Sequence, residues 1–404
     1  MRELTPDGYL LFATRVVRMF AYGFLSVVLV LYLADLGLSD TVIGVLLSLT
    51  LLGDTVISLG AATGADRIGR RRILVLGALL MLFAGAIFAF TNNIILLTLA
   101  AIIGVISPTG YEVGPFLAIE QAALAQTLPA ERRTGIFAWY NLIGSFATAL
   151  GALVGGALPH FLQWAGTTSL NSYRAVLLAY AAMGVVLALM FVRLSNGIEA
   201  SKTDAPIRQT RLGLHRSRGV VLKLSALFGL DAFAGGFVMQ SIVAYWFHIR
   251  FGVDPAILGG ILFGANLLAG VSALAAAWVA RKIGLVNTMV FTHLPSNVLL
   301  ILVPLMPNLP LAIAVLLLRF SISQMDVPTR QSYTLAVVAP DERSAAGGVT
   351  GIARTVGAAL SPALAGMFIS NPVLMSAPFV VAGGLKVLYD ILLFRSFRSV
   401  RVAT

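Results

Sequence analysis

Apolar runs long enough to cross a lipid bilayer recur from one end of the chain to the other. A membrane-spanning helix needs about 20 predominantly apolar residues, and we identify twelve such runs within the 404 residues. Because a bilayer offers no hydrogen-bond partner to an open backbone, runs of this kind must be helical. The sequence therefore predicts an all-α membrane protein with spans near 10–34, 41–63, 73–91, 95–127, 134–158, 173–193, 219–249, 255–279, 285–306, 309–339, 344–369 and 376–396.

The fourth of these runs contains an unusual number of residues that break helices in soluble proteins. Pro108, Gly110, Gly114 and Pro115 all lie within it. Neighbouring helices can satisfy the backbone groups that proline and glycine set free inside a membrane. We therefore expect one continuous helix over 95–127.

The composition supports a lipid environment and excludes several other classes of protein. Hydrophobic residues make up 58% of the chain and charged residues only 11%, against roughly 25% charged residues in soluble domains. The absence of cysteine excludes disulfides, thiolate metal sites and cysteine nucleophiles. No HExxH, Walker or GxSxG motif is present, so we expect neither an enzyme nor a bound cofactor.

The distribution of arginine and lysine predicts the orientation in the membrane. Positively charged loops remain in the cytoplasm, and most of the 28 basic residues fall in alternate loops on one side. Both termini are then cytoplasmic, and we expect a multi-pass protein of a bacterial-type plasma (inner) membrane. The net charge of +11 is explained by this asymmetry, without any nucleic-acid partner, and no cleavable signal peptide is expected.

A polar, basic segment divides the twelve spans into two sets of six. It covers 195–218 and separates an N-terminal bundle, 1–194, from a C-terminal bundle, 219–404. Four short stretches of the first half have counterparts in the second half, in the same order. These pairs are RMFAYGF and DAFAGGF, DLGLSDTVIGVLL and RFGVDPAILGGIL, GADRIGR and VARKIGL, and LPAERR and VAPDERS. The chain is therefore an internal duplication.

Residues 60–74, GAATGADRIGRRRIL, resemble the signature that the major facilitator superfamily carries between its second and third spans. The span count, the linker and the duplication agree with this resemblance. It implies two six-helix bundles related by a pseudo-two-fold axis along the membrane normal. It also implies a monomer that moves a small-molecule substrate across the lipid bilayer by alternating access.

The resemblance further implies a gating latch at the cytoplasmic ends of the second and third spans. Its residues are Gly64, Asp66, Arg67, Gly69 and Arg70, with Asp66 and Arg70 as the main members. A carboxylate there can hold an arginine or a helix N-terminus in one state and release it in another. Alternatively, the arginines only determine topology. The second copy has Arg281 in place of the aspartate, so a matching latch there is doubtful.

Ionisable residues inside the spans are costly and mark a transport pathway by default. We select seven as candidate substrate or proton ligands: Arg18, Glu112, Glu120, Asp231, Asp326, Arg330 and Arg354. Asp54 is a further candidate. Simple neutralisation is the alternative: Asp326 with Arg330, Glu120 with Arg354, and Lys386 with Asp390, four residues apart in the last span. His293 is expected to be a packing histidine.

The duplication adds two specific expectations about these residues. Glu112 and Asp326 should form a symmetry-related acidic pair, at least one of which titrates during transport. Arg18 and Asp231 occupy equivalent positions in the first repeated phrase. We expect both to face a central cavity, where they neutralise each other, unless Arg18 only extends to the cytoplasmic interface.

Three functions are compatible with these residues. The first is proton-coupled secondary transport, most simply the export of small organic molecules. The second is a uniporter or importer of an organic anion or zwitterion, with Arg18, Arg330 and Arg354 as ligands. The third is a lipid flippase of the same fold or, less simply, a membrane enzyme. The sequence does not identify the substrate.

Overall fold

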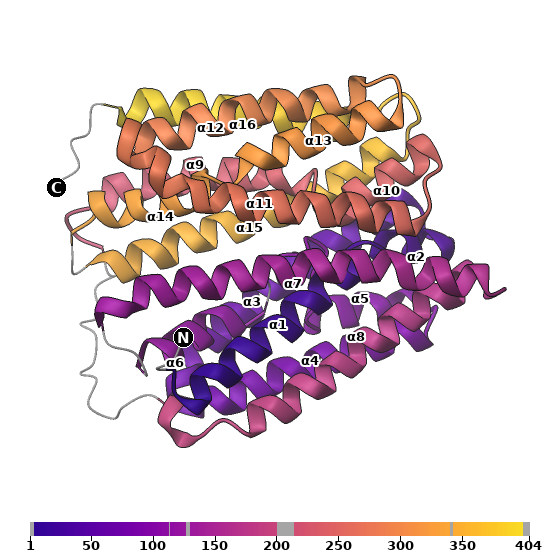
Figure 1. Cartoon of the computed structure of the whole chain (residues 1–404), viewed down its shortest axis with the longest axis horizontal. Coiled ribbons are helices and arrows are strands. Elements are labelled where there is room, and N and C mark those ends of the chain that lie inside the picture. Colours follow the sequence, from indigo (N-terminus) through magenta and orange to yellow (C-terminus); the bar gives the residue numbers. More distant parts are fainter. Residues whose placement is uncertain (1–3, 113, 127–129, 200–213, 340–341, 399–404) are drawn as a thin grey trace. The chain divides into compact units, whose positions relative to one another are not determined.

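Every regular element in the described part of the chain is a helix (Figure 1). The computed structural model describes residues 4–112, 114–126, 130–199, 214–339 and 342–398. Within these ranges, the side chains of 62, 63, 66, 130–134 and 344 are outside the description. The predicted all-α membrane fold is confirmed.

The first half of the chain contains eight α-helices and one short 3₁₀ helix in its described residues. They are α1 (Pro6–Ser26), α2 (Leu29–Asp35), α3 (Asp40–Ile68), α4 (Arg70–Phe90), α5 (Ile94–Ile103), α6 (Phe116–Gln126), α7 (Ala130–Trp164), α8 (Ser169–Val192) and η1 (Asn196–Ile198). Side chains start several of them: Thr5 accepts a hydrogen bond from the Gly8 amide in α1, and Asn93 accepts one from the Ile95 amide in α5.

The second half has the same all-helical character. Its elements are α9 (Arg218–Gly236), α10 (Gln240–Phe251), α11 (Pro255–Ile283), α12 (Leu285–Leu302), η3 (Val303–Leu305), α13 (Leu309–Ser323), α14 (Asp326–Val337), α15 (Arg343–Ile369) and α16 (Ala377–Phe397). Asn308 starts α13 by accepting a hydrogen bond from the Leu311 amide, as Thr5 and Asn93 do in the first half.

The described residues contain ten helical segments that are long and apolar enough to cross a membrane, two fewer than predicted. An eleventh is obtained if α1 and α2, which meet at an angle of 41°, are counted as one span. The remaining difference lies in the predicted fourth span, because α5 has only ten residues and is separated from α6 by residues 104–115.

The expectation of a continuous helix over 95–127 is therefore wrong. Gly110 and Gly114 have φ values of +71° and +81°, which lie outside the right-handed helical region. The backbone groups that are not bonded within a helix find partners elsewhere in the same compact unit of the chain, which is called unit 1 in the next paragraph. The Tyr180 hydroxyl donates to the Val105 carbonyl at 2.8 Å, and the Ser241 amide donates to the Pro108 carbonyl at 3.2 Å. Neighbouring helices thus do satisfy the backbone hydrogen-bonding groups of the predicted fourth span. They stabilise a break in this span, however, and not a continuous helix.

The chain forms two compact units that differ slightly from the two halves of the sequence. Unit 1 comprises Met1–Ser39, Leu49–Asp204 and Gln240–Phe263, and unit 2 comprises Asp40–Ser48, Ala205–Met239 and Gly264–Thr404. The division into bundles 1–194 and 219–404 with a linker at 195–218 stays a prediction.

In each unit, a closely packed helix pair occupies an equivalent place in the repeat. In unit 1, α1 packs on α7, and a Cβ added to Gly151 or Gly155 would collide with the carbonyls of Phe20 and Phe24. In unit 2, α9 packs on α15, and a Cβ on Gly357 would collide with the carbonyl of Gly229. Small residues allow such close approach in membranes, which explains the glycine-rich run at 151–156.

Candidate functional site

The first polar network lies in unit 1 and is centred on the fully buried Arg18 of α1. Its Nη1 and Nη2 donate to the two carboxylate oxygens of Glu120 on α6, both at 2.6 Å, and its Nε donates to Glu112 at 2.9 Å. Arg15, one turn earlier on α1, donates to the other oxygen of Glu112. Two arginines therefore neutralise two carboxylates.

Further side chains fix the geometry of this network. The Tyr140 hydroxyl of α7 and the Thr14 hydroxyl of α1 both donate to Glu120, the latter at 3.0 Å. The Arg18 guanidinium lies 4.7 Å from the centre of the Phe116 ring, which favours a cation–π interaction. Each oxygen of Glu120 accepts two hydrogen bonds, so this buried carboxylate is held firmly in place.

Glu112 and Asp54 are both tied to the interruption in the fourth span. Glu112 lies in the connecting segment, here defined as residues 104–112 together with Gly114 and Pro115. Asp54 of α3 accepts a hydrogen bond from the Gly114 amide, and a second one from the Ser58 hydroxyl at 3.4 Å. Asp54 thus anchors the end of the segment that carries Glu112.

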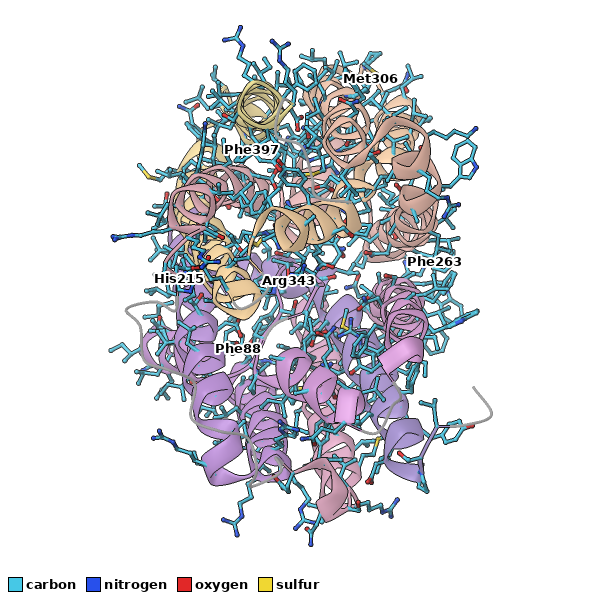
Figure 2. The ribbon with its side chains drawn as sticks, turned by 90° about the vertical axis from the view of Figure 1, so that its left-hand side faces the viewer. Phe88, His215, Phe263, Met306, Arg343 and Phe397 are labelled. Atoms are coloured by element: carbon cyan, nitrogen blue, oxygen red, sulfur yellow. The ribbon has the colours of Figure 1, made fainter. Side chains whose placement is uncertain are left out.

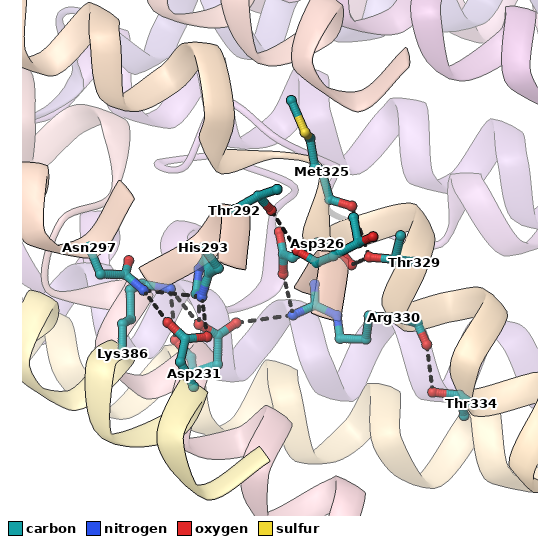
Figure 3. A network of polar contacts seen from close by, with 12 residues as sticks. Asp231, Thr292, His293, Asn297, Met325, Asp326, Thr329, Arg330, Thr334 and Lys386 are labelled. Atoms are coloured by element: carbon teal, nitrogen blue, oxygen red, sulfur yellow. Dashed lines mark hydrogen bonds and ion pairs between the residues drawn. The ribbon is translucent and has the colours of Figure 1, made fainter. Parts of the chain in front are cut away.

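The second polar network lies in unit 2 and is centred on Asp231 of α9 (Figure 3). Lys386 of α16 donates to one of its carboxylate oxygens at 2.6 Å, and Arg330 Nη1 of α14 donates to the other at 3.0 Å. The same Nη1 lies 3.2 Å from Asp326, one helical turn before Arg330. The predicted Asp326–Arg330 pair is confirmed, and Asp231 joins it.

A histidine connects this network to a third carboxylate. His293 of α12 has Nδ1 2.9 Å from Asp390 and Nε2 3.8 Å from Asp231. The Asn297 amide donates to Asp390 at 2.9 Å. His293 is therefore a buried histidine with its hydrogen bonds satisfied, as expected, and its partners place it in the ionic network.

The last span also differs from its prediction. Lys386 and Asp390 are four residues apart on α16, a spacing that permits a direct pair, but Lys386 bonds Asp231 and Asp390 bonds His293. The expected Lys386–Asp390 pair is wrong, because each residue has a partner on a neighbouring helix. The spacing of four residues places Lys386 and Asp390 on one face of α16. It does not show which helices pack against that face.

The two networks differ in their balance of permanent charge. The unit 1 network contains Arg15 and Arg18 against Glu112 and Glu120. The unit 2 network contains two permanent cations against three carboxylates, so the balance of its bonded groups depends on the protonation of a histidine. These are the members of the unit 2 network: Arg330, Lys386, Asp231, Asp326, Asp390 and His293.

Of the seven candidate ligands selected from the sequence, Arg354 is the one that belongs to neither network. It lies on α15 in unit 2, its side chain is exposed, and it makes no hydrogen bond or ion pair with the described residues. A Cβ added at Gly347 or Gly351 on the same helix would meet no atom within 4 Å, so open space lies beside it. The alternative pairing of Arg354 with Glu120 is not seen, since Glu120 bonds Arg18, Tyr140 and Thr14.

The residues that the repeat relates to each other bond partners within their own units. Glu112 bonds two arginines of unit 1, and Asp326 bonds Arg330 of unit 2. The titration of Glu112 or Asp326 stays a prediction. Arg18 and Asp231 are likewise neutralised by residues of their own units, so the reversed charge of the repeated phrase has a local explanation in each unit.

The latch residues are only partly described. The Asp66 side chain lies outside the described residues, and Arg67 is exposed. The Arg70 guanidinium donates to the Ile198 carbonyl at 3.1 Å, and Glu199 accepts the backbone amides of Arg70 at 2.6 Å and Arg71 at 3.3 Å. Glu199, which the sequence did not single out, is thus a carboxylate at the N-terminus of α4.

A comparable carboxylate contact occurs in unit 2, outside the spans. Glu342 accepts hydrogen bonds from the amides of Arg216 and Ser217 at 2.7 and 2.8 Å, and from the amide of His215. In Figure 2, His215 and Arg343, the neighbour of Glu342, lie at the same end of unit 2. Burial opposes ionisation, but the hydrogen bonds of Ser217, His215 and Arg216 outweigh it and lower the pKa of Glu342 to about 2.

Several members of the networks were missed or misjudged from the sequence. Arg15 is not among the seven residues selected from the sequence, and Tyr140 and Asn297 carried no signal, because a tyrosine or asparagine in a span is common. His293 and Lys386 did carry one, since buried ionisable groups mark functional positions. No group of three or more potential metal ligands occurs in the described part of the chain.

Comparison with known proteins agrees with this architecture. The sequence model of the Major Facilitator Superfamily matches residues 11–362. An uncharacterized membrane protein of Saccharomyces cerevisiae, YJR124C, is 32% identical over 98% of this chain and 94% of its own length.

Two further similarities are more distant. The quinolone resistance protein NorA of Staphylococcus aureus is 25% identical over 60% of each chain, so the match spans less than two thirds of that relative. The solved structure of a bacterial homologue of the human lysosomal transporter Spinster, inward-facing and occupied, has a TM-score of 0.77 at 16% identity. It covers 97% of this chain and 96% of that one, and shows a shared fold.

Proposed function

Because the chain belongs to the major facilitator superfamily, and is thus a multi-pass membrane protein with a transport role, we propose that it is a proton-coupled secondary transporter. In this proposal it exports a small organic solute by alternating access. The observation that carries the proposal is the unit 2 network, where His293 lies between Asp231 and Asp390. The partial similarity to a quinolone resistance protein supports export.

The charge balance suggests how a proton could control the change of state. Among the directly bonded groups, the network has three positive and three negative charges when His293 is protonated, and one excess negative charge when His293 is neutral. Arg354 of α15 makes no ion pair in the network but acts electrostatically on Asp231 and Asp326. An uncompensated charge in a low-dielectric interior is costly, so the two protonation states favour different conformations. In this mechanism His293 and Asp390 carry the proton, whereas Glu112 and Asp326 are bonded to arginines.

A second candidate function is transport of an organic anion or zwitterion. Arg354 supports it, because it is an arginine inside a span with open space beside it and no partner among the described side chains. Arg18 and Arg330 already bind carboxylates, so Arg354 is the better candidate for a substrate carboxylate or phosphate. Both functions agree if the exported solute carries a negative group.

We further propose that both termini are cytoplasmic, as the positive loops indicate, and that the latch operates at that side. Glu199, which holds the first amides of α4, takes part in it together with Arg70. A carboxylate at a helix N-terminus is stabilised by the helix dipole, so moving α4 away from Glu199 would cost free energy in one of the two states.

The proposal is tested with the full-length protein in liposomes that enclose a pH-sensitive dye. A quinolone, benzoate and a neutral sugar are added as probes under an imposed pH gradient. We expect at least one probe to move with protons, and His293→Asn to abolish the proton movement. The matched control is His160→Asn, since His160 is an exposed histidine 3.8 Å from Asp254. Proton movement that persists in His293→Asn would contradict the assignment of His293.

A further inference from the structure

Asp54 stands out among the carboxylates of the spans by the kind of partner it has. Glu112, Glu120, Asp231 and Asp326 each bond an arginine or lysine, and Asp390 bonds His293. Asp54 bonds only the Gly114 amide and the Ser58 hydroxyl, with no cation within ion-pair distance among the described side chains.

The two hydrogen bonds of Asp54 both go to the same oxygen. The Gly114 amide and the Ser58 hydroxyl donate to Oδ1, whereas Oδ2 has no hydrogen-bond partner in the described part of the chain. Asp54 is half-buried, so protons can reach it. A carboxylate held by neutral donors in a low-dielectric environment can take up a proton, whereas one bonded to arginine stays ionised.

The titratable groups around Asp54 come from three elements besides α3. Glu112 of the connecting segment acts on Asp54 as a like charge, and Tyr22 of α1 and Tyr180 of α8 lie within electrostatic range. The positive charges of the region, Arg15 and Arg18, are bonded to Glu112 and Glu120. Among the described side chains, the surroundings therefore contain no unbonded cation that would keep Asp54 ionised.

We infer that Asp54 is a second proton-binding group, located in unit 1, and that its protonation loosens the connecting segment of the broken fourth span. The inference gives the proposed proton coupling a site in unit 1, and it rests on that coupling only for its role in transport. The proton adds to Oδ2, and Oδ1 remains the acceptor for Gly114.

The chemical consequence is a weaker hydrogen bond between Asp54 and the connecting segment. A hydrogen bond from an amide to an ionised carboxylate is roughly twice as strong as one to a neutral acceptor, so protonation weakens the Gly114 contact. Gly114 follows Glu112 by two residues, and Glu112 is bonded to Arg15 and Arg18 of α1. Proton uptake at Asp54 is thus transmitted through the connecting segment to the unit 1 network.

The test is hydrogen–deuterium exchange of the full-length protein in lipid nanodiscs at pH 5.5 and pH 8. The observable is the exchange of the amides of residues 104–112 and Gly114, corrected for the intrinsic pH dependence of exchange. We expect roughly three- to tenfold faster opening at the lower pH in the native protein, the range set by replacing a charge-assisted hydrogen bond with a neutral one. Asp54→Asn, which mimics the protonated form, should exchange at the faster rate at both pH values.

The matched control is Asp254→Asn, because Asp254 also accepts a backbone amide, that of Ile257 at 3.1 Å, but lies before α11 outside the spans. It should keep the native pH response at 104–112. A pH response that persists in Asp54→Asn, or that is absent from the native protein, overturns the inference. Asp54→Glu, which keeps the ionisable group, should retain a response if the effect is protonation and lose it if Asp54 has only a structural role.

The exchange experiment is independent of the transported solute. If the liposome assay finds no proton movement while the exchange depends on Asp54, the proposed coupling fails and the proton site stands. If proton-driven transport is found and the exchange is unaffected by Asp54→Asn, the proton site fails and the coupling stands.

Discussion

The two polar networks differ in which helix supplies which charge. In unit 1 the first helix provides the arginines and the fourth predicted span provides the carboxylates, whereas in unit 2 the equivalent first helix provides the carboxylate Asp231. Arg330 and Lys386 supply the cations of unit 2 from α14 and α16. Duplication kept the helix positions and allowed the charges to exchange places, because a buried ion needs a partner but not a particular sign.

The networks also differ in how their charge balance is reached. Two arginines balance two carboxylates in unit 1. In unit 2 a histidine joins two cations and three carboxylates, so protons can change the balance. The comparison suggests a division of roles, in which protons act directly on the unit 2 network and reach the unit 1 network only through Asp54 and the connecting segment.

The largest expected effect concerns the independence of the two networks. Arg18→Gln and Asp231→Asn each leave buried charges uncompensated, which costs about 3–5 kcal/mol for a broken buried pair. Because each residue is neutralised in its own unit, the two decreases in the free energy of unfolding should add within about 0.5 kcal/mol in the double variant. Unfolding midpoints of the four proteins in detergent measure this, and a double variant more stable than the sum would show that Arg18 and Asp231 interact directly.

The next prediction uses the different geometry of the two central arginines. Arg18 uses three nitrogens to bind two carboxylates, whereas Arg330 contacts Asp231 and Asp326 through Nη1 alone. A lysine can replace one nitrogen but cannot form the bidentate pair. Arg18→Lys should therefore destabilise the protein by about 2 kcal/mol more than Arg330→Lys. Thermal unfolding measures the stability of both variants, and an equal decrease in stability would contradict this distinction between the networks.

Arg354 should behave unlike the arginines of either network. It has no ion-pair partner among the described residues, so Arg354→Gln should change the unfolding free energy by less than about 0.5 kcal/mol. Affinity for an anionic probe such as benzoate should fall about tenfold, as expected for loss of a charged hydrogen bond. Binding measured by thermal shift tests both parts, and an unchanged affinity would exclude Arg354 as an anion ligand.

The smallest effect is expected at Glu342, outside the membrane spans. Since its folded pKa of about 2 lies below the ordinary value of 4.5, its stabilisation is complete above about pH 4.5 and is lost as the pH falls through 2. Glu342→Gln should increase amide exchange at residues 215–217 at pH 7 and leave the unit 1 network unchanged. Native exchange that already rises sharply between pH 7 and pH 5 would contradict the low pKa.

Local patterns in the sequence predicted the helices and the shared helix face of Asp326 and Arg330, because both depend on neighbouring residues. They did not predict the interruption of the fourth span, since whether Gly110 and Gly114 bend a membrane helix depends on partners such as Tyr180 and Ser241. Nor did they predict the partners of Lys386, which lie on other helices. Which helix packs against a given face is a tertiary property that spacing along one helix does not contain.

The most direct test of the difference between the networks is the protonation state of His293. The chain has four histidines, so side-chain ¹⁵N NMR of histidine-labelled protein in nanodiscs can be assigned by single substitutions. We predict that the His293 signals change protonation state with pH, that Asp390→Asn shifts this change, and that Glu112→Gln does not. A His293 that keeps one protonation state over the whole pH range in which the protein stays folded would contradict the claim that protons act directly on the unit 2 network.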